Sequence, residues 1–169
     1  KLTKRLPSNP LAAATTSYGA FNPDANTLFE TGLGQTHLGW IGPTDATLKR
    51  SIEPLLSALL PPSNWHQDIS FALWKKLAIN AVINPLTAIH NLKNGELAEV
   101  KYNTNITDIC CEIANVMQAL GYTVDSLTLI KNVQQVISAT ANNYSSMHQD
   151  LKFERRTELE FISCYVQSK

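Results

Sequence analysis

The pattern of apolar and polar positions along the chain changes near residue 68. Before this point, two short segments, Thr27 to Thr31 and Thr36 to Ile41, are rich in β-branched and aromatic residues. Gly32 and Gly34 lie between them, so the pattern predicts a β-hairpin with the glycines as turn residues. After residue 68, apolar residues recur at steps of three and four, which is typical of helices.

Four helical stretches follow from this spacing and from capping residues. "ATLKRSIEPLLSALL" is predicted to form a helix capped by Thr44 or Asp45. A second helix should run from Ser70 to about Asn91, with a kink or break at Pro85, because proline removes a backbone hydrogen bond. "NITDICCEIANVMQALG" should end at Gly121, and "SLTLIKNVQQVISATANNY" should begin with Ser126 as its cap.

The sequence therefore predicts a mainly α fold in two parts. Residues 1–67 form a β-containing segment, and residues 68–169 form an all-helical domain that continues through "MHQDLKFER" and "TELEFISCYVQ". The chain opens with lysine and ends within a helical pattern, so we interpret it as a fragment of a longer protein.

Composition narrows the classes of function. The 14 basic and 14 acidic residues balance, which argues against a nucleic-acid-binding surface; the one dense basic cluster, "KLTKR", is interpreted as a solvated terminus. No apolar run approaches the roughly 20 residues that cross a bilayer, so no membrane partner is expected. The 3 cysteines include no CxxC pair, which predicts neither disulfides nor a metal site and favours a reducing, cytoplasmic compartment.

A polar column interrupts the apolar stretch "WKKLAINAVINPLTAIHNLKNGE". Lys76, Asn80 and Asn84 follow at intervals of four residues, so they share one slowly spiralling helix face, displaced by about 40° per step. A generic column of this kind is a solvated helix face, but asparagine is a weak helix former and the flanking residues are apolar nearly all round. We therefore expect the column to line a cavity. An ammonium and two carboxamides suit an anionic keto or hydroxy substrate, and a partly desolvated lysine can donate a proton.

A second polar block, "NNYSSMHQDLKFERRTELE", lies around a helix junction and contains Asn143, Ser146 and Glu158. Each of these residues also has an ordinary interpretation as a cap, a turn residue or a solvated charge. His148 has no metal-ligand partners in the sequence and is interpreted as structural.

Together the two blocks resemble the signature blocks of the ketopantoate reductase family. The lysine, both asparagines, the proline and "NGEL" lie at the family's spacing, and "SSM-QD" and "R-TE" match in the second block. "TTSYGAF" and "TGLGQTHLGWIGP" resemble the end of the family's nucleotide-binding domain. The resemblance implies a β-rich remnant of a Rossmann domain followed by a helical substrate and dimerisation domain like the C-terminal domain of 6-phosphogluconate dehydrogenase.

The resemblance also implies roles for individual residues. Lys76 falls on the proton donor, and Glu158 on a glutamate that contacts the cofactor and the catalytic lysine. Ala20 aligns with a backbone contact to the nucleotide. The implied substrate-binding residues are Asn80, Asn84, Asn94, Asn143 and Ser146.

The implied function is NADPH-dependent reduction of 2-dehydropantoate to pantoate, in pantothenate and coenzyme A biosynthesis. The family's N-terminal GxGxxG unit is absent from this chain, so the fragment alone is expected to be inactive. Two alternatives stay open: a reductase of another 2-keto acid on the same scaffold, or a non-catalytic helical dimerisation module. A homodimer through the helical domain is also expected.

Overall fold

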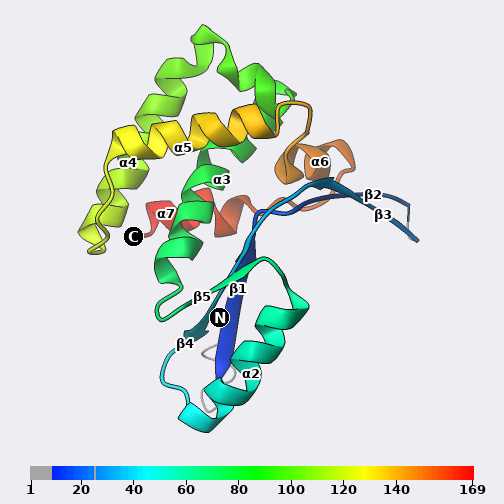
Figure 1. Ribbon diagram of the computed structural model, residues 1–169. Helices are drawn as coiled ribbons and strands as arrows, with labels where there is room; N and C mark the ends of the chain where they lie inside the picture. The colour runs from blue at the N-terminus through cyan, green and yellow to red at the C-terminus, as the bar shows by residue number, and fades with distance from the viewer. Residues whose placement is uncertain (1–8, 25) are drawn as a thin grey trace. The chain divides into compact units, whose positions relative to one another are not determined.

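The computed structural model describes residues 9–24 and 26–169, so the basic cluster "KLTKR" lies outside the described residues. The chain forms two compact units, one ending at Leu73 and the other running from Trp74 to Lys169. We call these the N-terminal unit and the helical unit, and each is described by itself. Most of the described residues are helical, so the predicted mainly α class is confirmed (Figure 1).

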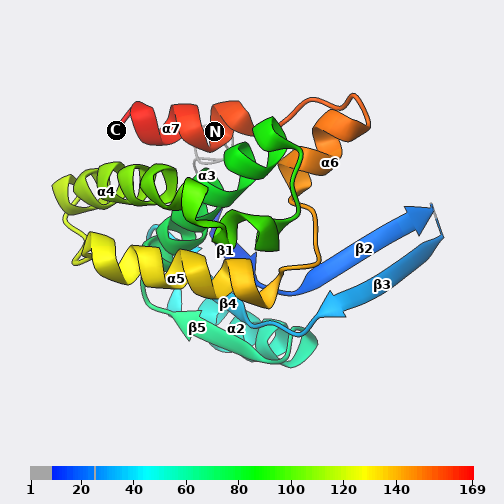
Figure 2. The same cartoon turned by 90° about the horizontal axis from the view of Figure 1, so that it is seen from above.

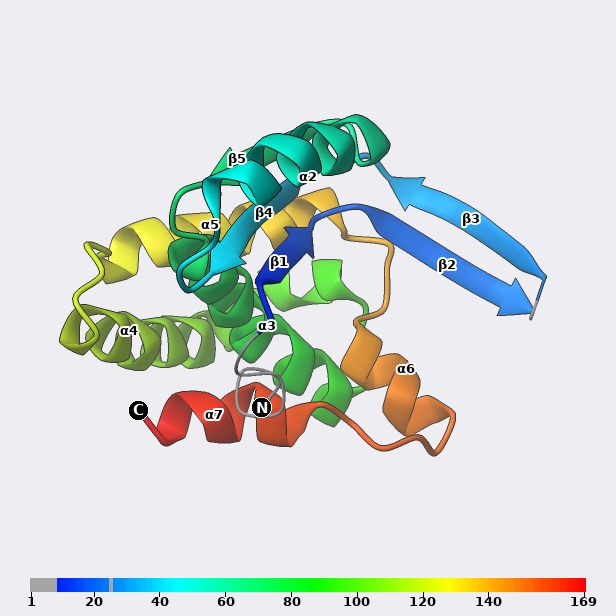
Figure 3. The same ribbon diagram turned by 90° about the horizontal axis from the view of Figure 1, so that it is seen from below.

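The N-terminal unit is built on a three-stranded sheet with the order β1-β4-β5. Strand β1 (Leu11–Thr16) pairs antiparallel with β4 (Thr36–Ile41), and β4 pairs in parallel with β5 (Ser63–His66). Two parallel neighbours need a crossover connection, which helix α2 (Ala46–Leu59) supplies (Figure 3). Gly39 allows the segment that follows β5 to approach β4, since a Cβ on it would lie 2.7 Å from Cβ of the buried Ile69.

The predicted hairpin is wrong in its pairing, although both of its strands exist. Strand β3 (Thr27–Gly32) pairs with β2 (Gly19–Asp24), whereas the strand after the glycines, β4, pairs with β1. Between the two sheets, the Ser17 N–H donates to the Gln35 carbonyl at 3.1 Å. A Cβ on Gly34 would overlap the backbone of Ser17 and Tyr18. Gly34 therefore permits close approach of two chain segments and does not reverse the chain.

The helical unit packs its helices around one apolar core. Helices α4 and α5 lie side by side (Figure 2) and contribute buried apolar side chains, among them Ile113 and Met117 from α4 and Val133 and Ile137 from α5. The elements are α3 (Ser70–His90), η1 (Asn94–Ala98), η2 (Val100–Tyr102), α4 (Asn103–Ala119), α5 (Ser126–Ala139), α6 (Ser146–Lys152), η3 (Leu159–Phe161) and α7 (Ser163–Gln167).

Helix α3 continues through Pro85 to His90, so the predicted break is wrong. Proline removes one backbone hydrogen bond, but the residues on either side are held by tertiary packing. Val82 is fully buried and Leu86 is nearly so. Since most helix stability in proteins comes from such packing, the buried faces outweigh the lost bond.

Helix ends follow the capping chemistry with one correction. Helix α4 ends at Ala119, and the predicted terminating glycine, Gly121, directly follows its C-cap Leu120 at φ 89°, with the Tyr122 N–H bonded to the Met117 carbonyl at 3.0 Å. Asp45 caps α2. The cap of α5 is Asp125 and not Ser126, because the Asp125 carboxylate accepts from the Thr128 N–H at 2.8 Å. Hydrogen bonds from the Thr128 hydroxyl and N–H lower the pKa of Asp125.

Among the described residues, no helix combines the length and apolar character that crossing a membrane requires.

Candidate active site

The polar column of α3 passes from the surface of the helical unit into its interior. Lys76 is exposed, Asn80 is half-buried and Asn84 is only 6% exposed. Eight residues of α-helix separate Lys76 from Asn84, a rise of about 12 Å. Ala78, Ala81 and Val82 are buried on the remaining faces of the helix. Lys76 is therefore exposed to solvent in the structure, whereas Asn80 and Asn84 lie successively deeper in the helical unit.

At its inner end the column meets the second polar block. The Asn84 side-chain Nδ2 donates a long hydrogen bond of 3.4 Å to Ser146 Oγ, across 62 residues of sequence. Ser146 is the first residue of α6, and it is exposed to solvent. The fold thus brings a buried carboxamide and an exposed hydroxyl, one from each block, to the same place.

Asn94 and Asn143 form a second pair. The Asn94 N–H donates to the Asn143 carbonyl at 2.9 Å, and Asn94 Nδ2 donates to Thr140 Oγ1 at 2.9 Å. Thr140 donates its own hydrogen to the Val136 carbonyl at 2.7 Å, which fixes the orientation of the Asn94 amide. Asn94 Oδ1 is then a buried acceptor without a partner among the described residues. Such an atom is costly unless a donor reaches it, which fits the predicted ligand-binding role.

Gly95 makes the approach of Asn94 to α5 possible. Its N–H donates to the Ala141 carbonyl at 3.1 Å, and an added Cβ would lie 2.7 Å from Ala141 Cβ. Only a residue without a Cβ fits this contact, so the glycine of "NGEL" is a packing requirement that places its asparagine neighbour.

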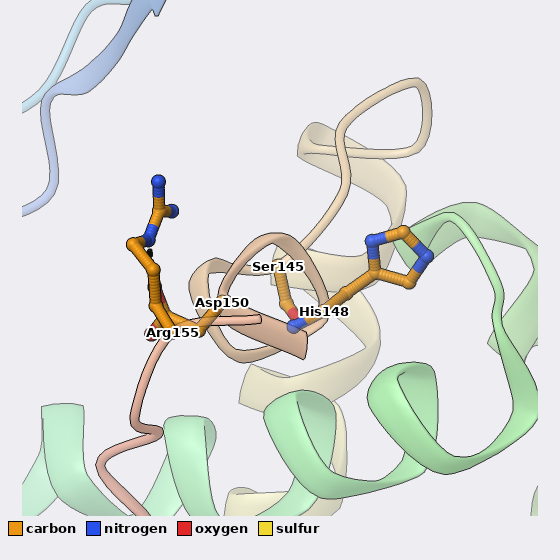
Figure 4. A network of polar contacts seen from close by, with 4 residues as sticks. All are labelled: Ser145, His148, Asp150 and Arg155. Atoms are coloured by element: carbon orange, nitrogen blue, oxygen red, sulfur yellow. Dashed lines mark hydrogen bonds and ion pairs between the residues drawn. The ribbon is translucent and has the colours of Figure 1, made fainter. Parts of the chain in front are cut away.

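An ion pair joins the C-terminal part of α6 to the segment that precedes Glu158. Arg155 Nε lies 3.0 Å from Asp150 Oδ1, and the Arg155 N–H donates to the Asp150 carbonyl at 2.7 Å (Figure 4). Glu158 follows as the N-cap residue of η3, with its carbonyl accepting from the Phe161 N–H at 2.9 Å. The side chain of Glu158 is exposed, as is that of Lys76. Contact between these two side chains stays a prediction.

His148 lies beneath this surface and ties α6 to the end of α3. Its Nε2 is 2.7 Å from Asn91 Oδ1, and its ring stacks on Tyr144 with the centroids 4.3 Å apart. Burial lowers the pKa of His148, and the charge of Lys152 lowers it further. These contacts agree with the interpretation of His148 as a structural residue.

The N-terminus of α2 is not free to bind the phosphates of a dinucleotide. The helix N-terminus of a strand–helix–strand unit commonly receives a pyrophosphate. Here the Asp45 carboxylate occupies that position on α2 and accepts from the Thr47 N–H at 2.8 Å. Ala20, the predicted nucleotide contact, is exposed in β2, with its backbone opposite Glu30. Within the described part of the chain, His, Cys, Asp and Glu form no group of three or more placed to hold a metal.

One open cavity, of about 360 Å³, belongs to the N-terminal unit. Its lining is mainly apolar and contains no carboxylate, lysine or histidine: Ala14, Thr16, Tyr18, Thr36, Leu59, Leu60 and Pro61. None of the predicted site residues lines it, so it is not the candidate active site.

One site-adjacent residue, Thr87, was not recognised as important from the sequence. Thr87 is fully buried in α3 and hydrogen bonds to Ser145, the cap of α6, at 2.7 Å. The available signal was a threonine three residues after Asn84 within an apolar helix. Ser145 could not be identified as the hydrogen-bond partner of Thr87 without the fold.

Comparisons with known proteins agree with this arrangement. Residues 68–168 match the family described as "Ketopantoate reductase PanE/ApbA C terminal". The chain is 42% identical over 170 residues to 2-dehydropantoate 2-reductase of Vibrio cholerae, covering 99% of this chain and 56% of the relative. For the enzyme of Escherichia coli O157:H7 the identity is 40% over 157 residues, covering 93% and 50%. The chain thus spans about half the length of the curated relatives it matches.

Solved structures show the same fold. A ternary structure of D-mandelate dehydrogenase with NADH and anilino(oxo)acetate superposes with a TM-score of 0.81 at 21% identity, covering 93% of this chain and 52% of the other. A probable 2-dehydropantoate 2-reductase from Bacillus subtilis matches with a TM-score of 0.69 at 25% identity, covering 93% and 53%. With the polar residues of both sequence blocks in place on this fold, the chain belongs to the ketopantoate reductase family.

Proposed function

We propose that this chain is the substrate-binding part of an NADPH-dependent 2-dehydropantoate 2-reductase. The observation that carries the proposal is the contact between Asn84 and Ser146, which joins the two polar blocks at 3.4 Å on the family's fold. Relatives about 40% identical that bear this name support the choice of substrate. We propose the division of the chain as residues 1–67 from the nucleotide-binding domain and 68–169 from the helical domain.

In this proposal the residues of the column and of the second polar block bind one keto acid together. Asn80, Asn84 and Ser146 hydrogen bond to its hydroxyl and carboxylate oxygens, while Asn94 and Asn143 close the pocket beside them. A reduced nicotinamide, when bound, would supply the hydride that the keto carbon receives. Lys76 Nζ then gives a proton to the developing alkoxide oxygen.

The remaining assigned residues support the lysine and the cofactor. Glu158 would orient Lys76 and hold the nicotinamide ribose, and the backbone at Ala20 would contact the nucleotide. Because Lys76 is exposed in this chain, we infer that bound substrate and cofactor exclude water from it during the reaction. The three cysteines are free, which fits the proposed cytoplasmic location.

Replacing Lys76 tests the proposal. In the full-length protein, Lys76→Ala should lower kcat for ketopantoate by about a hundredfold or more, since general-acid catalysis contributes roughly 10²–10⁴-fold. Oxidation of NADPH, followed by its absorbance, is the measurement. The matched control is Lys75→Ala, an exposed lysine one position earlier and therefore about 100° around the helix. Equal losses in the two variants, or a wild-type rate for Lys76→Ala, would refute the assignment.

Two further measurements separate the alternatives. Steady-state kinetics with other branched and aryl 2-keto acids would identify a different substrate if one of them is preferred to ketopantoate. Calorimetry of this chain with NADPH should detect no tight binding, because Asp45 occupies the N-terminus of α2. Submicromolar binding would contradict our account of the nucleotide site.

We also propose that the helical unit forms a homodimer. Ile89, Val100 and Leu127 are 75%, 82% and 69% exposed, which leaves apolar surface for a second copy. One solved relative is titled a dimeric ketopantoate reductase from Staphylococcus aureus. Sedimentation of the full-length protein over a range of concentrations tests this: a monomer at every concentration would refute it.

A further inference from the structure

A pair of buried hydroxyl groups lies directly behind the Asn84–Ser146 contact. Thr87 is 0% exposed and Ser145 is 6% exposed, and their side-chain oxygens are 2.7 Å apart. Thr87 lies one helical turn beyond Asn84 on α3, and Ser145 immediately precedes Ser146. Each hydroxyl is therefore adjacent in sequence or in the helix to one member of the proposed substrate-binding pair.

The hydrogen atoms in this pair can be placed by elimination. Thr87 Oγ1 has one hydrogen and lies 2.8 Å from the Ile83 carbonyl and 3.2 Å from the Asn84 carbonyl, which can only accept. If Thr87 gives its hydrogen to one of these carbonyls, the Ser145 hydroxyl must donate to Thr87 Oγ1. Ser145 Oγ in turn accepts from the His148 N–H at 3.1 Å. One order satisfies every group: the His148 N–H donates to Ser145, Ser145 donates to Thr87, and Thr87 donates to the α3 carbonyls.

This hydroxyl relay links the backbones of two helices without involving the histidine ring. Figure 4 shows the imidazole of His148 pointing away from the Ser145 hydroxyl, which contacts the His148 backbone nitrogen. The relay starts in the first turn of α6 and ends on α3 at the carbonyls of Ile83 and Asn84. It therefore sets the distance between the backbones that carry Ser146 and Asn84. Burial makes it stiff, because breaking one link leaves polar groups unpaired away from water.

We propose that Thr87 and Ser145 are positioning residues that hold Ser146 opposite Asn84 for the keto acid. The inference rests on the proposed function for its substrate, but the relay itself is a feature of the fold. Neither hydroxyl is available to touch the substrate, since both are buried and engaged within the relay. Their effect is expected on substrate affinity and not on proton transfer.

The experiment replaces Thr87 in the full-length protein with valine, which keeps the shape and removes the hydroxyl. Thr87→Val should raise KM for ketopantoate about tenfold, with kcat changed less than about threefold and KM for NADPH unchanged. Thr87→Ser restores the hydroxyl and should return KM to within about twofold of wild type. An unchanged KM in Thr87→Val, or a raised KM that Thr87→Ser fails to restore, would overturn the proposal.

A stability control separates positioning from general loosening of the fold. Ile113→Val removes one methyl group from the buried face of α4 and lowers the melting temperature without touching the relay. It should leave KM for ketopantoate unchanged at an equal loss of melting temperature. If Ile113→Val raises KM as much as Thr87→Val does, the positioning role is wrong.

Hydrogen exchange distinguishes failure of this inference from failure of the proposed function. Without any substrate, Thr87→Val should accelerate exchange of the His148 amide, and Ile113→Val should not, because only the first breaks the relay. If the wild-type protein reduces no ketopantoate, the proposed function fails while faster exchange still supports the relay. Unchanged exchange at His148 would refute the relay whatever the substrate.

Discussion

The glycine of "NGEL" offers a quantitative test of how the site is packed. In Gly95→Ala the new Cβ would lie 2.7 Å from Ala141 Cβ and 2.9 Å from both Ala141 Cα and its carbonyl oxygen. Two of these are backbone atoms, so relief requires η1 to move away from the end of α5. Overpacking of this kind costs about 1–3 kcal/mol. Stretching the Gly95 hydrogen bond to the Ala141 carbonyl adds about 1 kcal/mol.

Alanine also favours helical backbone over glycine by about 1 kcal/mol, which offsets part of this cost. We therefore expect Gly95→Ala to destabilise the helical unit by about 2 kcal/mol and, through Asn94, to raise KM for the keto acid. Urea unfolding followed by circular dichroism measures the free energy. Gly32→Ala is the matched control, since an added Cβ there meets nothing within 4 Å. Equal urea midpoints in the two variants would refute the packing argument.

The remaining predictions concern titrating groups. Burial, with a smaller contribution from Cys111, raises the pKa of Cys110 to about 11, so at pH 8 a thiol reagent should label the exposed Cys164 rapidly and Cys110 only on unfolding. Fast labelling of Cys110 in the folded protein would contradict its burial. The lowered pKa of His148 means that the unfolded chain binds this proton more tightly, so stability should fall as pH drops below about 6.5. Melting temperatures from pH 8 to pH 5 measure this, and His148→Gln should reduce the loss; an unchanged pH dependence in that variant would show that other groups cause it.

Apolar spacing and capping residues predicted the helices well, because both patterns are contained in short stretches of sequence. Leu129, Val133 and Ile137 recur at helical spacing and are buried on one face of α5, and the predicted terminating glycine, Gly121, follows the C-cap of α4. The error at Ser126 has a local cause as well. Asp125 precedes it, and its ionised carboxylate accepts from both the Thr128 N–H and hydroxyl.

Strand pairing and the course of α3 could not be predicted in the same way. The strands on both sides of Gly32 and Gly34 were identified, but their partners lie earlier in the chain, at β1 and β2. Pairing depends on contacts between distant segments, which neither propensity nor turn residues encode. The break expected at Pro85 failed because packing around Val82 and Leu86 decides whether a helix survives a missing hydrogen bond.

The sequence by itself predicted which residues would carry the chemistry. The interval of four between Lys76, Asn80 and Asn84 places them on one helix face wherever that helix packs, and the two polar blocks identified the family. Tertiary structure alone decided which of these residues contact one another and how exposed each one is to solvent. Asn84 reaches Ser146, Asn94 reaches Asn143, and Lys76 stays exposed, because burial depends on neighbours that are distant in sequence. The relay through Thr87 and Ser145 has the same origin, since a hydrogen bond across 58 residues exists only after α3 and α6 have packed together.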